Sequence, residues 1–179
     1  MKLFRKHYYI ILQHIFQFNQ WHTATIYERE YAMWLSKKVN SLLSGGSHGQ
    51  IIEVGCGLGD ILSEIHLPNH QKTGYDIEEN VIKALKFAHP GLHGKVGSLN
   101  NIKNQTIDIL IAVNWLHALD DDWFQRNMAY VVKHNHINRI IVDTVPTPPY
   151  AYSHDYIEFL KNMDMFWKRN PGDSDAWAE

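Results

Sequence analysis

Residues 51–60 read Ile-Ile-Glu-Val-Gly-Cys-Gly-Leu-Gly-Asp. An apolar, β-prone run is followed by three glycines at alternate positions and then by an acidic residue that suits the start of a helix. This order predicts a strand, a tight turn and a helix N-terminus. Glycine permits positive φ angles and close approach of a ligand to the backbone, so the stretch is typical of a cofactor-binding turn. A purely structural connection between strand and helix is the alternative.

A second acidic residue supports the cofactor interpretation. Residues 72–76 read Lys-Thr-Gly-Tyr-Asp, which predicts a short strand that ends in a carboxylate. Asp76 lies near the spacing, about 20 residues after the glycine turn, at which βαβ nucleotide sites carry a ribose-binding acid. The dinucleotide pattern Gly-x-Gly-x-x-Gly/Ala is not met, because Asp60 occupies the position of the third small residue. An NAD-linked oxidoreductase is therefore disfavoured.

Length and composition bound the class of protein. A chain of 179 residues with 45% hydrophobic residues predicts one compact domain. The formal net charge of −2 gives no basic footprint, so nucleic acid is not expected as a partner. The single cysteine, Cys56, cannot form an intramolecular disulfide and fits a reducing, cytoplasmic location. The N-terminal apolar run at 8–12 is far too short to span a bilayer, so no stable membrane insertion is expected.

The form Glu53-x-Gly55-x-Gly57-x-Gly59 resembles the first motif of class I S-adenosylmethionine-dependent methyltransferases. The resemblance covers about residues 50–145 and implies a Rossmann-like, doubly wound α/β sheet of about five to six mostly parallel strands, with S-adenosylmethionine as the cofactor. It implies that Glu53 orients the methionine amino group and that Asp76 binds the ribose. Many relatives place an acid after the third strand to bind adenine, whereas this chain has Ser98 or Leu99 there. The cofactor-binding residues expected from the resemblance are Glu53, Gly55, Cys56, Gly57, Gly59, Asp76, Ile77, Ser98, Leu99 and Asn114.

The rest of the chain is expected to surround this core. Residues 1–46 predict two helices, at 8–16 and 24–43, that cover the cofactor or shape the acceptor pocket. Trp21 and His22 between them either reach into the site or form a hydrophobic staple and a surface imidazole. Residues 50–145 form the cofactor-binding core, and residues 146–179 supply an acceptor loop, a helix at 155–163 and a shortened C-terminal end with one short strand at 165–167. We expect all three parts to form a single methyltransferase-like domain.

Further helices and strands are read from periodicity. Helices are predicted at 60–66 and 78–88 and from Asp120 onward, and strands at 93–97, 106–113 and 139–145. The acids at 120–122 suit a helix start rather than a metal site, and His134 and His136 are placed at a helix end. No metal is expected. Because the fifth strand lies near a sheet edge, its cover is expected from the tail, the N-terminal helices or a second subunit, which would make a homodimer.

Two histidines are candidate catalytic residues. Asn114 to His117 follow a buried strand, and open α/β sheets bind ligands beyond the carboxyl ends of their strands. His117 is thus a candidate base, with packing beneath the cofactor as its alternative role. His154, on a proline-rich aromatic loop, is the second candidate. The predicted function is methyl transfer to a small or medium-sized acceptor, with a hydroxyl of a sugar or glycan precursor preferred. The alternative is a noncatalytic binding module with the same fold.

Overall fold

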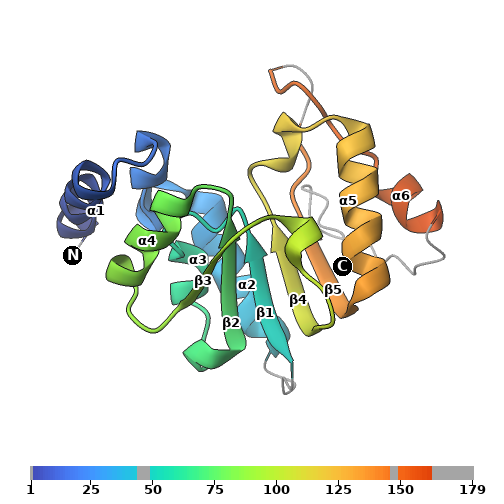
Figure 1. Ribbon diagram of the computed structural model, residues 1–179, viewed down its shortest axis with the longest axis horizontal. Coiled ribbons are helices and arrows are strands. Elements are labelled where there is room, and N and C mark those ends of the chain that lie inside the picture. Colours follow the sequence, from blue (N-terminus) through green and yellow to red (C-terminus); the bar gives the residue numbers. More distant parts are fainter. Residues whose placement is uncertain (1, 44–48, 146–148, 163–179) are drawn as a thin grey trace. The chain divides into compact units, whose positions relative to one another are not determined.

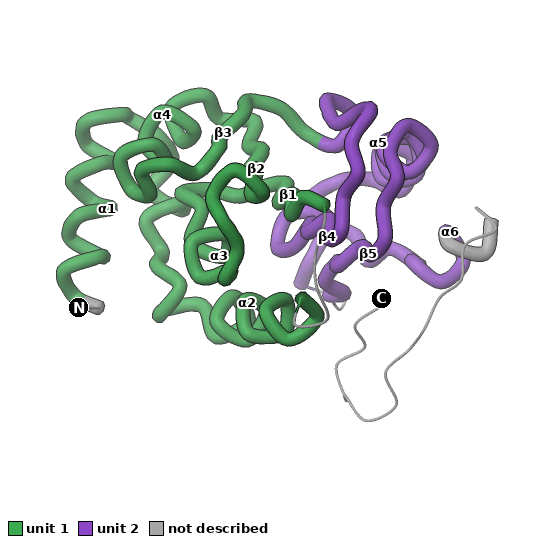
Figure 2. Tube along the Cα trace, turned by 90° about the horizontal axis from the view of Figure 1, so that it is seen from below, with its two compact units in different colours: residues 1–98 green, residues 99–179 purple. Residues whose placement is uncertain are grey.

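The computed structural model describes residues 2–43, 49–145 and 149–162. The chain forms two compact units, Met1–Ser98 and Leu99–Glu179, which Figure 2 distinguishes by colour. We call them unit 1 and unit 2. The single domain with three parts, residues 1–46, 50–145 and 146–179, stays a prediction from the sequence.

Unit 1 contains three parallel strands and the helices that cover them (Figure 1). The strands lie in the order β3-β2-β1, and both pairings are parallel. The helical elements, in chain order, are α1 (Lys2–Phe16), η1 (Gln20–Thr23), η2 (Ile26–Glu28), α2 (Glu30–Leu43), α3 (Asp60–Ser63), η3 (Asn69–Gln71) and α4 (Glu79–Ala88). The strands are β1 (Gln50–Val54), β2 (Lys72–Asp76) and β3 (His93–Val96).

The central strand of unit 1 is buried along its whole length, as a strand covered on both faces should be. In register, Glu53 of β1 lies opposite Gly74 of β2, and Val54 lies opposite Tyr75. Both strands therefore end side by side, with the glycine turn following β1 and Asp76 closing β2. This arrangement brings the two sequence signals together.

Helix α1 joins unit 1 through its apolar face. Apolar residues at helical spacing in α1 pack, together with Phe18, against α4 and the glycine turn. The buried members of this cluster are Tyr9, Leu12, Phe18, Leu58, Val81 and Ala84. None of the helices in the described ranges has the length and hydrophobicity that a membrane span requires.

Unit 2 contains two parallel strands, β4 (Thr106–Ala112) and β5 (His136–Val142), with Ile107 opposite Ile137 in register. Its helical elements are η4 (Leu99–Asn101), η5 (Leu116–Ala118), α5 (Asp121–His134) and α6 (Tyr156–Asn162). Asp120 caps α5 by accepting a hydrogen bond from the Trp123 backbone N–H at 2.7 Å, in agreement with the predicted helix start. The five described strands, all paired in parallel, and their flanking helices confirm the Rossmann-like α/β prediction.

Several predicted boundaries are wrong. The helix predicted at 24–43 splits, because Thr25 and Glu28 form a capping box that starts η2, and Arg29 is extended before α2. The helix predicted at 60–66 ends at Ser63, one turn before the Leu67-Pro68 sequence that cannot continue it.

The fifth strand begins earlier than predicted. Asn135 adopts an extended conformation, and its side chain donates to the carbonyls of Val131 and Ile102, which ends α5. His134 is therefore the last residue of α5 while His136 begins β5, so the two histidines do not share a helix end. The strand predicted at 165–167 lies outside the described residues.

Candidate functional site

The three glycines of the turn in unit 1 all adopt backbone conformations that favour glycine. Gly55, Gly57 and Gly59 have φ angles of 74°, 54° and 83°, a region that residues with a Cβ rarely adopt. The backbone N–H groups of Gly55 and Cys56 both donate to the Tyr75 carbonyl, at 2.8 and 3.0 Å. The end of β2 therefore holds the turn in place.

The glycine turn packs closely against β2 because the Cys56 side chain contacts Gly74, which has no side chain of its own. A Cβ on Gly74 would lie 2.6 Å from the Cys56 Sγ atom, so only glycine fits at that position. The thiol is buried, and burial raises its pKa well above the ordinary value. The structure thus places Cys56 as a packing residue under the turn.

Asp76 ties the turn to the segment that follows β2. Its carboxylate accepts hydrogen bonds from the backbone N–H groups of Gly57 and Glu78, each at 3.0 Å. A carboxylate has about four lone-pair positions, so both oxygens retain acceptor capacity for hydroxyl groups. Ile77, the next residue, leaves 76% of its surface exposed, which is unusual for a large apolar side chain.

Glu53 is buried beneath the turn with one oxygen unpaired. Its Oε2 atom has no hydrogen-bond partner among the described residues, while the carboxyl accepts a hydrogen bond from the Leu62 backbone. Burial raises the pKa of Glu53 to about 8, against an opposing effect of the Arg29 charge. A buried acceptor without a donor is costly, so this atom suits a ligand that brings one, such as an ammonium group.

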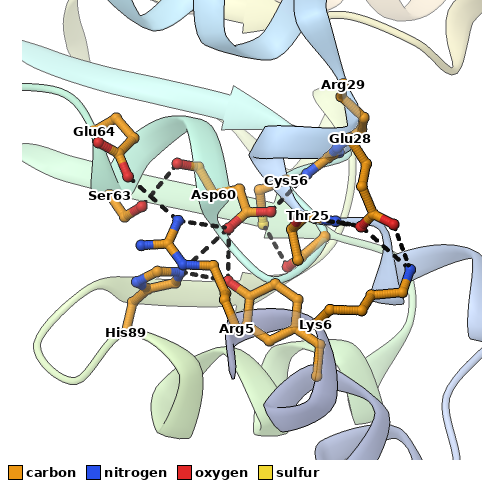
Figure 3. Close-up of polar contacts among 12 residues, drawn as sticks. Arg5, Lys6, Thr25, Glu28, Arg29, Cys56, Asp60, Ser63, Glu64 and His89 are labelled. Atoms are coloured by element: carbon orange, nitrogen blue, oxygen red, sulfur yellow. Dashed lines mark hydrogen bonds and ion pairs between the residues drawn. The ribbon is translucent and has the colours of Figure 1, made fainter. Parts of the chain in front are cut away.

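Figure 3 shows the polar network around Asp60, the first residue of α3, at the end of the glycine turn. The Tyr9 hydroxyl donates to Oδ1 at 2.6 Å, and the Arg29 guanidinium donates to Oδ2 at 2.8 Å. Arg5 lies 3.7 Å from the same carboxylate. Because the Tyr9 hydrogen goes to Asp60, its oxygen accepts from the His89 Nε2–H at 3.0 Å.

Burial alone would raise the pKa of Asp60, but the nearby His89 imidazole, whose Nε2 lies 3.7 Å from Oδ1, the Tyr9 hydrogen bond and the Arg29 charge outweigh it and hold the pKa below the ordinary value. Asp60 thus remains a carboxylate inside unit 1. The sequence identified this residue only as a helix starter. Its partners come from α1, from the residue before α2 and from the end of α4.

In unit 2, polar groups follow both strands. Asn114 comes after β4 with a φ of 66°, a strained conformation for a residue other than glycine, and its backbone N–H donates to the Asp143 Oδ2 at 2.8 Å. Asp143 follows β5. Its Oδ1 is buried without a hydrogen-bond partner among the described residues, and burial raises the pKa of this carboxyl.

The two candidate histidines of unit 2 differ in their surroundings. His117 lies in η5, its ring packs 4.4 Å from the Tyr150 ring, and its Nδ1 is buried with no hydrogen-bond partner in the described part of the chain. His154 is fully engaged: Nδ1 lies 2.6 Å from Asp121 Oδ1 and Nε2 lies 2.9 Å from the Leu116 carbonyl. Both ring nitrogens therefore face oxygen atoms that can accept hydrogen bonds.

The structure therefore brings together, within unit 1, the residues from the glycine turn, Asp76 and Ile77, whereas Leu99, Asn114, His117 and His154 belong to unit 2. Ser98 is the last residue of unit 1, and Leu99 is fully buried. Sequence reasoning missed Asp143, although the rule that selected Asn114 applies to it as well, because it directly follows the carboxyl end of a parallel strand. Among the described residues, no group of three or more His, Cys, Asp or Glu side chains could hold a metal ion.

The features of unit 1 define a class: an α/β protein with a glycine turn and a carboxylate at the ends of adjacent parallel strands, as in nucleotide-cofactor sites. Residues 52–136 match the protein family described as "Methyltransferase domain". This match, over a little less than half of the chain, confirms the resemblance to class I methyltransferases, and S-adenosylmethionine is that family's cofactor. A search of curated proteins found no match.

Solved structures show the same fold at low sequence identity. Magnesium protoporphyrin IX methyltransferase (ChlM) from Synechocystis PCC 6803 with bound SAM aligns with a TM-score of 0.59 and 14% identity, over 90% of this chain and 82% of that one. A putative O-methyltransferase from Nostoc punctiforme PCC 73102 aligns with a TM-score of 0.60 and 14% identity, over 80% of this chain and 54% of its own. TehB from Haemophilus influenzae aligns with a TM-score of 0.57 and 15% identity, over 79% and 59%.

Proposed function

We propose that this chain is an S-adenosylmethionine-dependent methyltransferase that acts on a small or medium-sized acceptor. The observation that supports the proposal is the pair of carboxylates at the ends of β1 and β2. Glu53 has a buried oxygen without a donor, and Asp76 retains acceptor capacity beside three glycines in left-handed conformations. An ammonium group and a vicinal pair of hydroxyl groups, which the methionine and ribose parts of the cofactor carry, match these two needs.

When bound, the cofactor supplies a methyl group on a sulfonium, which needs no further activation. The remaining tasks fall to the protein, which must align the acceptor, exclude water and accept a proton. For a hydroxyl acceptor, the oxygen forms a bond to the methyl carbon as the carbon–sulfur bond breaks, and the hydroxyl proton passes to a base.

We assign the role of base to His117 rather than His154. A base needs a nitrogen with a free lone pair, and both nitrogens of His154 face acceptors within hydrogen-bond distance. His117 makes no such pair of contacts. His154 instead positions its own segment, residues 149–154, through contacts with Asp121 and Leu116.

A hydroxyl of a sugar or glycan precursor is the acceptor that we propose. Tyr150 and Tyr152 each leave 40% of their surface exposed, and both adjoin His117: the Tyr150 ring packs on the imidazole, and the Tyr152 N–H donates to the His117 carbonyl at 3.2 Å. Aromatic faces with a polar edge suit the apolar face and hydroxyl edge of a sugar ring. The proposed enzyme is cytoplasmic.

The first experiment measures binding of S-adenosylhomocysteine by calorimetry, followed by incubation with methyl-labelled cofactor and fractionated cell extract. We expect binding and transfer of label to a carbohydrate-containing fraction, with the label stable to alkali as an ether is. Binding without transfer to any fraction would favour the noncatalytic module. Label in protein or nucleic acid would contradict the proposed acceptor class.

Variants then separate the two histidines. His117→Ala should lower turnover about a hundredfold or more, because general-base catalysis contributes about 10²–10⁴-fold, while S-adenosylhomocysteine binding stays near the wild-type value. His154→Gln can donate only one of the two hydrogen bonds and should lower the unfolding temperature more than it lowers turnover of the folded protein. Wild-type turnover in His117→Ala would eliminate His117 as the base.

A further inference from the structure

One carboxylate, that of Asp60, holds both the helix that precedes residues 17–29 and the last residue of this segment between α1 and α2. Asp60 accepts from Tyr9 of α1 at 2.6 Å and from Arg29, just before α2, at 2.8 Å. We call residues 17–29 the strap. Asp60 is 2% exposed, so releasing either end would break a buried, charge-assisted contact. The strap therefore cannot swing away from unit 1 as a free flap.

The middle of the strap lies against the glycine turn. A Cβ built on Gly57 would lie 3.1 Å from the His22 Nδ1 atom, so the imidazole occupies the side of Gly57 from which its own side chain is missing. Gly57 has a φ of 54°, and its open side faces His22 of the strap. A ligand that approaches the Gly57 backbone closely would therefore lie beside the His22 ring.

Glu78 holds the imidazole there. Its Oε1 lies 3.1 Å from the His22 Nε2, and its Oε2 accepts from the Asn19 backbone N–H at 3.4 Å. The Glu78 backbone N–H in turn donates to Asp76. The contacts thus run from His22 through Glu78 to the carboxylate assigned to the ribose, and from that carboxylate back to the Gly57 N–H.

The neighbouring residues of the strap do not share this position. Trp21 leaves 69% of its surface exposed, whereas only 17% of the His22 side chain is exposed. The Phe18 ring lies 6.2 Å from the imidazole in an edge-on arrangement and is itself buried in the α1 core. Of the two residues that the sequence left undecided, His22 is the one that the fold directs to the turn.

We propose that His22 contacts the bound cofactor and, held by Glu78, limits its release. The inference rests on the proposed function. Because Asp60 holds both α1, through Tyr9, and the end of the strap, through Arg29, we expect release of the cofactor to require movement of the His22 side chain and loss of its contact with Glu78. Loss of this contact should therefore increase the dissociation rate more than it changes the chemical step.

The test is the dissociation rate of S-adenosylhomocysteine, measured by stopped-flow displacement, in the wild type, His22→Ala, His22→Phe and Glu78→Ala. We expect dissociation about tenfold faster or more in His22→Ala and Glu78→Ala, which corresponds to tenfold weaker binding at an unchanged association rate. His22→Phe keeps a ring over Gly57 without the bond to Glu78 and should give an intermediate rate. The donor KM should rise while kcat stays near the wild-type value.

Two matched controls lie in unit 1. His70 is an exposed histidine in η3, and Glu79 is the exposed neighbour of Glu78, paired with Lys83 on the surface of α4. His70→Ala and Glu79→Ala should release the ligand at the wild-type rate. A second readout is the imidazole NMR signal of His22, which should shift on addition of S-adenosylhomocysteine while that of His70 does not.

The outcomes separate the two proposals. Failure of the folded wild type to bind S-adenosylhomocysteine overturns the proposed function, and this inference with it. Binding by the wild type with unchanged or slower dissociation in His22→Phe and Glu78→Ala overturns the inference alone, as does an unshifted His22 signal. Should His22→Ala fail to fold, these two variants decide the matter.

Discussion

The buried carboxylates of the two units are treated very differently. In unit 1, both oxygens of Asp60 are paired, by Tyr9 and Arg29, and its pKa lies below the ordinary value. In unit 2, one oxygen of Asp143 is paired with the Asn114 backbone and the other has no partner among the described residues, and its pKa is raised. The difference indicates that Asp60 stabilises unit 1. Burial of an unpaired Asp143 oxygen costs free energy, and a purely structural role does not explain that cost.

The largest effect is expected from Asp60→Ala. The substitution removes the partner of Arg29 and Tyr9 in a buried site, which typically costs about 3–5 kcal/mol of stability. Urea unfolding monitored by a probe in unit 1 measures this loss. Glu64→Ala is the control, because Glu64 is half-exposed and also pairs with Arg5, and surface pairs contribute about 0–1 kcal/mol. Equal losses of unfolding free energy in Asp60→Ala and Glu64→Ala would show that the buried Asp60 network stabilises unit 1 no more than a surface ion pair does.

Asp76→Ala tests the part of unit 1 assigned to the ligand. Loss of an acceptor for two hydroxyl groups should weaken S-adenosylmethionine binding by about 1.5–3 kcal/mol, or roughly ten- to hundredfold in Kd. The amides of Gly57 and Glu78 lose their acceptor as well, so some loss of stability accompanies it. Calorimetry on folded protein is the measurement, and an unchanged Kd would refute the assignment.

A pH dependence distinguishes Glu53 from Asp60 within unit 1. Burial raises the pKa of Glu53 to about 8 in the folded protein, above the unfolded value near 4.5, so the folded state holds the extra proton between these pH values. Stability from this group is present below pH 4.5 and is lost as pH rises toward 8, with a slope of up to about 1.4 kcal/mol per pH unit. Glu53→Gln should abolish that slope.

Denaturation curves from pH 5 to pH 8 for the wild type and Glu53→Gln make the comparison. The difference in stability between them should favour Glu53→Gln increasingly as pH rises. Bound S-adenosylmethionine should reduce the slope in the wild type, because a cation near Glu53 favours the carboxylate. Parallel curves without ligand would show that the Glu53 pKa is not raised.

The smallest effect is expected from Asp143→Asn. Asparagine keeps an oxygen for the Asn114 N–H but removes a charge that burial disfavours, so stability at pH 7 should change little or rise, by up to about 1 kcal/mol. The same exchange at Asp60 should be clearly destabilising. If Asp143→Asn is as harmful to unfolding stability as Asp60→Asn, the contrast between the two carboxylates does not hold.

The sequence predicted best what depends on neighbouring residues. The glycine turn and the strand at 72–76 were predicted correctly, because a short apolar run, three glycines and a terminal carboxylate act locally. The end of α5 was missed because the Asn135 side chain, rather than a glycine or proline, terminates the helix. Such a signal is weak in a single sequence.

The Asp60 network could not be predicted. The three residues Tyr9, Asp60 and His89 are separated by tens of residues in the sequence. Taken locally, Tyr9 is a core tyrosine, Asp60 starts a helix and His89 ends one. No periodic pattern records that polar groups on distant segments will meet. The position of His22 against Gly57 has the same origin, because it depends on contacts that α1 and the end of the strap make with the distant Asp60.

The anchoring of α1 has a consequence for the order in which the chain folds. The partners of Tyr9 in the Asp60 network, Asp60 and His89, are synthesised long after α1. Synthesis proceeds from the N-terminus, so α1 leaves the ribosome before these partners and must wait, with its apolar face uncovered, until α4 has emerged. Contacts between residues so far apart in the sequence form slowly. Docking of α1 is therefore expected to be among the last events in the folding of unit 1, and the nascent chain is most exposed to aggregation before it occurs.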